Sequence, residues 1–185
     1  GQQLDELPEA LDALDLPAPD RWLAKGWSGH SLRTKSDLGK WMAKLMFDLV
    51  RLRSRLAKEI RSGGAPLVLV HGDTITTPIG AVLGRMLRVD VAHVEAGLRS
   101  GTWRSPFPEE LDRRFTTKLA TVHFAPGDEA VANLRAAKAK GHIVDTELNT
   151  VFDALNMVKH LPPSHGLQLP DRYGLVSIHR GELIE

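Results

Sequence analysis

Short apolar runs alternate with helix-like stretches between residues 66 and 161, and this alternation limits the folds open to the chain. The runs are PLVLV at 66–70, VDVAHVE at 89–95, TVHFA at 121–125 and HIVDT at 142–146. Runs of this kind, bounded by turn-forming residues, are typical of buried parallel strands, which need long crossover connections. The sequence therefore predicts an α/β fold, with a parallel sheet flanked by helices on both faces.

The stretches between these runs carry apolar residues at spacings of three and four. They predict helices over 36–62, 76–87, 108–120, 128–141 and 150–161. A further strand is predicted over 173–179, after a segment rich in Pro and Gly. We therefore expect one α/β domain over 1–160, a linker over 161–170 and the start of a second domain over 171–185.

Composition excludes several classes of function. The formal net charge is +1, from 24 basic and 23 acidic residues, which argues against a general attraction to nucleic acid or to an anionic membrane. With no cysteine there is no disulfide, thiolate metal site or cysteine nucleophile, as is compatible with a cytoplasmic protein. We expect no secretory signal and no membrane span, since no apolar run approaches about 20 residues.

Acidic side chains follow the first two predicted strands. Asp73 comes just after the first, and Glu95 ends the second. In open α/β sheets, ligands bind beyond the carboxyl ends of the strands. The HGDTITT loop also opens a helix, whose free N–H groups favour phosphate. Neither a Walker loop nor G-x-G-x-x-G occurs, so conventional ATP or NAD binding is not indicated.

A third carboxylate stands at the start of the predicted helix over 108–120. Glu109 follows Pro108, where the helix dipole favours an ionised carboxylate, and Arg113 lies one turn further on. Leu111, Phe115 and Leu119 form a separate stripe, which predicts the core-facing side. The Glu109–Arg113 edge is then free to face a site shared with Asp73 and Glu95, which suits proton removal and return.

Structural roles compete with this interpretation. Glu109 and Arg113 alone could form a surface ion pair, and Asp73 could be a helix cap or turn residue. Histidines 71, 93 and 123 occupy similar places on three strands. Ordinary hydrogen bonds explain them better than a metal does, because they lack compact ligand spacing.

Several motifs, in this order and spacing, resemble the non-hydrolysing UDP-N-acetylglucosamine 2-epimerases. They are VHGDTITTPIGA, VAHVEAGLRSG, PFPEELDRR, LATVHFAP and LVSIHRGE, within residues 66–182. The resemblance implies two Rossmann-like domains with the active site in their cleft, a glycosyltransferase-B-like architecture that would be incomplete here. It implies interconversion of UDP-GlcNAc and UDP-ManNAc through elimination of UDP to 2-acetamidoglucal and re-addition, with no metal or other cofactor.

The resemblance also implies roles for single residues. Asp73, Glu95 and Glu109 match the family's catalytic carboxylates, although which is the base and which the acid stays open. Arg113 matches a substrate-binding arginine, and His179 matches a histidine that contacts UDP. HRGEL at 179–183 departs from the commoner HRRE, which removes one basic residue beside the diphosphate.

The expected protein is thus a cytoplasmic isomerase for polysaccharide biosynthesis, a homodimer at full length, and the chain a truncated form with little activity alone. The alternatives are a hydrolysing epimerase, a nucleotide-sugar glycosyltransferase of the same fold and a non-catalytic binding module. A metal-dependent hydrolase using His71, Asp73, His93 and Glu95 is a weaker alternative.

Overall fold

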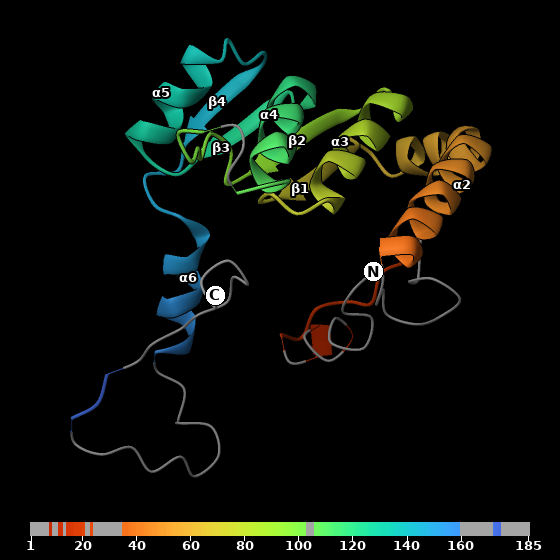
Figure 1. The fold of residues 1–185 in the computed structure, drawn as a ribbon. Coiled ribbons are helices and arrows are strands. Elements are labelled where there is room, and N and C mark those ends of the chain that lie inside the picture. Colours follow the sequence, from red (N-terminus) through yellow and green to blue (C-terminus); the bar gives the residue numbers. More distant parts are fainter. Residues whose placement is uncertain are drawn as a thin grey trace. The chain divides into compact units, whose positions relative to one another are not determined.

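The computed structural model describes residues 8, 11–12, 14–20, 23, 35–102, 106–159 and 172–174. The chain divides into two compact units, residues 1–149 and 150–185. The first unit holds helices and strands in the order α2 (Lys35–Ser62), β1 (Leu67–His71), α3 (Thr76–Leu87), β2 (Asp90–Val94), α4 (Glu109–Leu119), β3 (Val122–Ala125), α5 (Asp128–Ala136) and β4 (His142–Asp145) (Figure 1). The second unit holds α6 (Thr150–Val158).

The four strands form one parallel sheet in the order β1-β2-β3-β4. The predicted fold class is confirmed, and each of the four apolar runs lies on a strand. In the register of the sheet, His93 on β2 stands opposite Val70 on β1 and opposite His123 on β3. All four strands therefore end at the same edge, where the loops after β1 and β2 meet.

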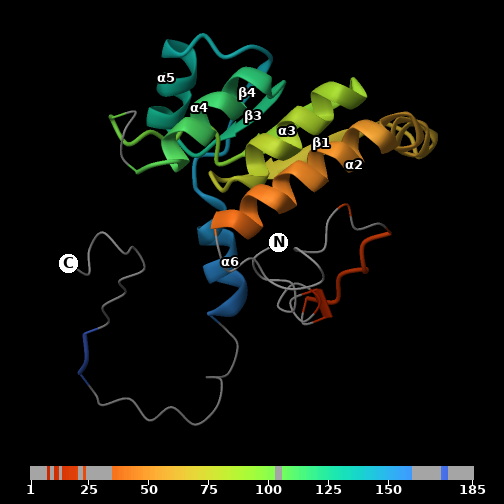
Figure 2. The same cartoon turned by 45° about the vertical axis from the view of Figure 1, so that its right-hand side comes forward.

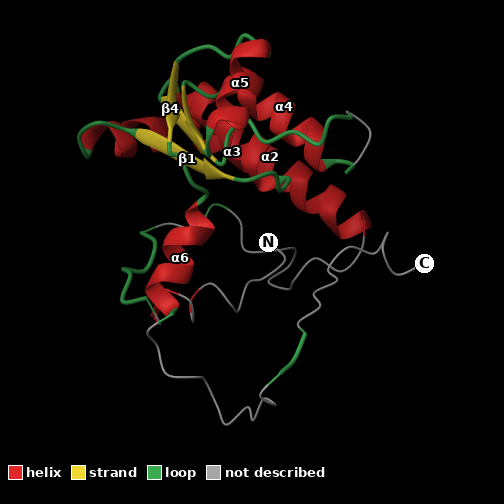
Figure 3. Cartoon of the chain, turned by 90° about the vertical axis from the view of Figure 1, so that its left-hand side faces the viewer, coloured by secondary structure: helices red, strands yellow, loops and turns green. Residues whose placement is uncertain are grey.

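Helices α3 and α4 pack side by side against the sheet, and α2 runs alongside α3 (Figures 2 and 3). The main core joins the apolar stripe of α2 to the end of α3, through Trp41, Leu45, Leu49, Leu56, Leu87 and Val89. Gly84 lets α3 approach the sheet, since a Cβ atom there would lie 2.3 Å from Cγ2 of Val91. A second core beneath α5 consists mainly of alanines and Leu134.

The prediction that the sheet is covered on both faces is wrong for β1. Leu67 and Leu69 are 52% and 63% exposed, while Val70 is buried. One face of β1 packs on α3, and the exposure of Leu67 and Leu69 shows that the described chain leaves the other face largely open. The sequence pattern predicted a strand with apolar side chains on both faces, but the described part of the chain covers only one face of β1.

The predicted core-facing stripe of α4 is wrong for Leu111 and Phe115, although Leu119 packs against a core cluster. Phe115 is 48% exposed and Leu111 39%, whereas the helix buries Glu110, Thr116 and Thr117. The inward face of α4 is thus polar, and a charged residue occupies the place where periodicity predicted an apolar one. This orientation turns the start of α4 toward the loop after β1.

The predicted domain boundaries remain a prediction. The linker over 161–170 lies outside the described residues, and so does the strand predicted over 173–179 apart from its first two residues. α6 belongs to the second unit and buries none of its side chains.

Candidate functional site

Asp73 lies in the turn between β1 and α3, at the carboxyl edge of the sheet. The turn is fixed by Gly72, whose N–H donates to the carbonyl of Val94 at 3.1 Å and whose φ of 67° suits glycine. The carboxylate of Asp73 accepts a hydrogen bond from Nη2 of Arg113 on α4. The loop after β1 is thereby joined to α4 by an ion pair.

Glu95 follows β2 and has a φ of 62°, in the left-handed region that non-glycine residues seldom adopt. Such backbone strain is concentrated at functional sites, where the surrounding fold holds it. Its Oε2 lies 3.8 Å from Nε2 of His71, and a Cβ at Gly72 would lie 3.5 Å from the same oxygen. Glu95 therefore reaches toward the turn that carries Asp73.

Glu109 is the first residue of α4, as predicted, with Pro108 as the N-cap. One carboxylate oxygen, Oε2, is buried and has no hydrogen-bond partner in the described part of the chain. The surface ion pair between Glu109 and Arg113, the competing structural interpretation, is not formed, because Arg113 turns to Asp73 and to Glu110 instead. Glu109 is thus held at a helix N-terminus with an acceptor available to a ligand.

Glu110 is the centre of the charge network, and sequence reasoning gave it no role. Its side chain is fully buried and accepts from Nε of Arg114 at 2.7 Å and from the N–H of Ser100 at 3.2 Å. Guanidinium nitrogens of Arg113 and Arg99 lie 3.6 and 3.9 Å away. The spacing of Arg113 and Arg114, three and four residues after Glu110, could have indicated ion pairs along the helix. Nothing in the local sequence indicated that Glu110 is buried.

Arg113 links the β1–α3 turn to α4. Its side chain is 15% exposed and lies between Asp73 on the β1–α3 turn and Glu110 on its own helix. A guanidinium group can serve two carboxylates in this way because its donors form a planar fork. Arg113 is thus placed to position both carboxylates, while its predicted contact with substrate stays a prediction.

Asp112 is a fourth carboxyl group at the site, which the sequence analysis did not single out. Burial, together with the negative charges of Glu109 and Asp73, raises its pKa from 3.8 to about 6. Its Oδ2 is buried without a hydrogen-bond partner in the described chain. Glu109 and Asp73 are therefore both close enough to Asp112 to disfavour its negative charge.

Two of the three strand histidines, His93 and His123, form hydrogen bonds to backbone carbonyls, as predicted, whereas His71 is exposed near Glu95. Nε2 of His93 donates to the carbonyl of Gly72 at 2.8 Å, and Nε2 of His123 donates to that of Lys140 at 2.9 Å. Burial lowers the pKa of His93 to about 4 and also lowers that of His123, so both rings are neutral near pH 7. His93 thereby supports the backbone of the turn that carries Asp73.

Of the five predicted site residues, Asp73 and Arg113 are in direct contact, and Glu109 and Asp73 both act electrostatically on the neighbouring Asp112. Glu95 approaches them through Gly72, and His179 lies outside the described residues. In the described chain, no three His, Asp or Glu side chains are grouped closely enough to hold a metal ion. The described helices include none long and apolar enough to span a bilayer.

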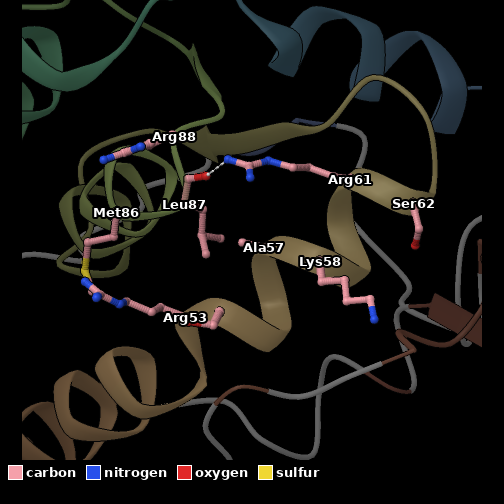
Figure 4. Close-up of a pocket in the computed structure, with 9 residues that line it drawn as sticks. Arg53, Ala57, Lys58, Arg61, Ser62, Met86, Leu87 and Arg88 are labelled. Carbon is pink, nitrogen blue, oxygen red and sulfur yellow. Dashed lines mark hydrogen bonds between the residues drawn. The ribbon is translucent and has the colours of Figure 1, made fainter.

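A separate basic pocket of about 710 Å³ lies where α2 and α3 end (Figure 4). Arg53, Lys58, Arg61 and Arg88 line it, and Arg61 donates to the carbonyl of Leu87 at 2.9 Å. In Figure 4 the cationic groups do not converge on one point. Although this pocket is roomy, we place the candidate site at the carboxylates, because strained backbone, unpartnered acceptors and charge pairs coincide there.

The fold and the site define an α/β protein with a cluster of carboxyl groups at the carboxyl edge of a parallel sheet. Comparison with known proteins makes this specific. A sequence profile of the UDP-N-acetylglucosamine 2-epimerase family matches residues 12–185, and the chain belongs to this family.

Individual relatives agree with this assignment. The UDP-N-acetylglucosamine 2-epimerase of Bacillus subtilis (strain 168) is 42% identical over 137 residues, covering 72% of this chain and 35% of the relative. A crystal structure of a UDP-N-acetylglucosamine 2-epimerase is 35% identical, with a TM-score of 0.63 over 87% of this chain and 41% of the other. The Neisseria meningitidis enzyme bound to UDP-GlcNAc is 27% identical, with a TM-score of 0.57 over 86% and 40%. The chain therefore spans between a third and about two fifths of the length of these three relatives.

Proposed function

We propose that this chain supplies the carboxylate side of the active site of a UDP-N-acetylglucosamine 2-epimerase. The observation that carries the proposal is the contact between Arg113 and Asp73, which brings the start of α4, with Glu109, to the turn after β1. Membership of the family supports it, as does the relative from Neisseria meningitidis, which binds UDP-GlcNAc.

The proposed reaction inverts the configuration at C2 of the sugar. One carboxylate removes the C2 proton as the bond between C1 and the UDP oxygen breaks, which leaves 2-acetamidoglucal and UDP. A carboxyl group on the other face returns a proton to C2, and UDP adds again at C1, so the non-hydrolysing route releases no free sugar. Asp73, Glu95 and Glu109 are the proposed acid and base groups, and a weakly acidic C–H needs such positioned groups.

The geometry favours different supporting roles for the neighbouring residues. Arg113 orients Asp73, since its guanidinium is already occupied by two carboxylates. The start of α4 provides a helix dipole that stabilises negative charge at Glu109. His179 is the proposed contact to UDP, carried over from the family motif alone.

Further parts of the proposal concern the whole protein. We propose a cytoplasmic homodimer at full length that supplies activated N-acetylmannosamine for polysaccharide biosynthesis, and domain boundaries at 160 and 171. Because the chain spans little more than a third of the length of its relatives, we propose that the 185-residue chain alone turns over little substrate.

The test follows deuterium at C2 by NMR, with UDP-GlcNAc in deuterated water. It uses the 185-residue chain and a chimera in which the 137 aligned residues replace those of the Bacillus subtilis relative. The proposal expects deuterated UDP-ManNAc from the chimera and little from the chain alone.

Other products identify the other functions. Free N-acetylmannosamine with UDP indicates a hydrolysing epimerase, and turnover that requires an added acceptor indicates a glycosyltransferase. A folded chimera that binds UDP-GlcNAc without exchange at C2 indicates a binding module. Each of these three results contradicts the proposed reaction.

A further inference from the structure

Asp112 and Glu109 stand three residues apart in the first turns of α4, so their side chains lie on the same face of the helix. Each has one buried carboxyl oxygen without a hydrogen-bond partner in the described chain, Oδ2 of Asp112 and Oε2 of Glu109. Two such groups side by side carry repulsion as well as a desolvation cost if both are ionised.

The neighbouring cations do not relieve this repulsion. Arg113 pairs with Asp73 and lies 3.6 Å from Glu110, and both Arg99 and Arg114 pair with Glu110. Within the described residues, no ion pair joins one of these guanidinium groups to Asp112 or Glu109. From the loop after β1 the group facing Asp112 is Asp73, which is another acid. From α3, which packs against α4, the only charged side chain is Arg85, in the last turn.

We propose that Asp112 is a positioning residue that holds one proton of the site and, through Glu109, sets how much negative charge the site presents to an anionic nucleotide sugar. The proposal rests on the proposed function for the identity of the ligand. The raised pKa of Asp112, about 6, agrees with a proton that is lost within the physiological range.

A purely structural role for Asp112 makes a different prediction. An acidic residue in the first turn of a helix is stabilised by the dipole, and this favours its ionised form at all pH values above about 4. Such a residue would titrate near its ordinary value and would not change the environment of Glu109 near neutrality.

The test is a titration of the side-chain carboxyl carbons by NMR, from pH 3 to 8.5, on the 185-residue chain labelled at Asp and Glu. The variants are Asp112→Asn, which keeps the shape and mimics the protonated form, and Glu129→Gln, a control at an exposed acid on α5. We expect one Asp signal with a midpoint near pH 6 that is lost only in Asp112→Asn. The Glu109 signal should inflect at the same pH in the chain and in the control, but not in Asp112→Asn.

A midpoint for Asp112 near 4, or a Glu109 signal without the shared inflection, overturns the inference. A second arm measures UDP-GlcNAc binding to the chimera, since this diphosphate ester does not itself titrate near pH 6. We expect Asp112→Asn to bind about as well as the parent chimera at pH 5 and several times more tightly at pH 8, because one negative charge is missing. Equal affinities at pH 8 also overturn it. Absence of UDP-GlcNAc binding at every pH contradicts the proposed function, whereas the titration decides the role of Asp112 independently.

Discussion

Replacing Glu110 by Gln should destabilise the fold strongly, although the side chain keeps its shape. Glu110 is fully buried and lies within 4 Å of three guanidinium groups, and it accepts from Ser100 as well. Arg113 keeps its ion pair with Asp73, but Arg99 is only 11% exposed and Glu110 is its carboxylate partner in the described chain, so loss of the carboxylate charge leaves Arg99 poorly hydrated and uncompensated.

The magnitude follows from this burial. Removing one member of a buried charge pair costs about 3–5 kcal/mol, since the remaining charge stays desolvated. Arg114 is 47% exposed and can be hydrated after the substitution, so it contributes little to the loss of stability. Gln also keeps a side-chain oxygen able to accept from Ser100, which places the expected loss near the lower end, about 3 kcal/mol.

The assay is urea unfolding followed by far-ultraviolet circular dichroism on the 185-residue chain. Glu129→Gln is the matched control and should change the free energy of unfolding by less than about 0.5 kcal/mol. A double variant, Glu110→Gln with Arg99→Gln, should recover part of the loss, because one uncompensated cation is removed. If Glu110→Gln unfolds within about 0.5 kcal/mol of the parent, the network around Glu110 does not stabilise the fold as argued.

Three further predictions concern stability. Because folding lowers the pKa of His93 to about 4 from 6.5, its contribution is present above pH 6.5 and is lost as the pH falls toward 4. Urea unfolding across this range should show a loss of up to about 3 kcal/mol, reduced in His93→Asn; an unchanged pH dependence in the variant contradicts the assignment. The pH dependence from Asp112 has the opposite sign, because folding raises the pKa of this group. The free energy of unfolding of Asp112→Asn should exceed that of the parent by up to about 1 kcal/mol at pH 8, allowing for solvent screening, and by nothing below pH 4. Equal stability of the two at pH 8 argues against burial of that charge. Gly84→Ala should cost about 1–3 kcal/mol through the contact with Val91, as seen by the same unfolding assay; a neutral result would show that α3 can move away from the sheet.

Much of the fold was predictable because it depends on local patterns. Four apolar runs of strand length, separated by helical stretches, admit few arrangements other than a parallel sheet. The placement of Asp73 and Glu95 followed from the same logic, since residues after parallel strands share one edge. For Asp73 and Glu95, the order of strands and loops along the chain was enough to predict their place at the edge of the sheet.

The orientation of α4 was not predictable in this way. Periodicity assumes that the apolar face of a helix looks inward, and by that rule Phe115 belongs in the core. The structure instead buries Glu110, whose partners include Arg99 and Ser100 in a preceding loop. That pairing depends on how the loop after β2 contacts α4. The spacing of apolar residues along one helix cannot predict such a contact.

The role of Asp112 was hidden for a related reason. An acid in the first turn of a helix is ordinary, and its sequence neighbours include two arginines that could have paired with it. Those arginines are occupied by Asp73 and Glu110. Only the three-dimensional pairing shows that Asp112 is left beside another carboxylate.

The central claim is that the carboxylates at the edge of the sheet perform proton transfer at C2. The most direct test measures deuterium incorporation at C2 of the nucleotide sugar by the chimera and by its Asp73→Asn, Glu95→Gln and Glu109→Gln variants, with Glu129→Gln as control. The account predicts that each of the three variants stays folded and loses at least about 100-fold in exchange rate, as expected for a general acid or base, while the control keeps its rate. Exchange that survives in all three folded variants would contradict the account, because proton transfer would then belong to other residues.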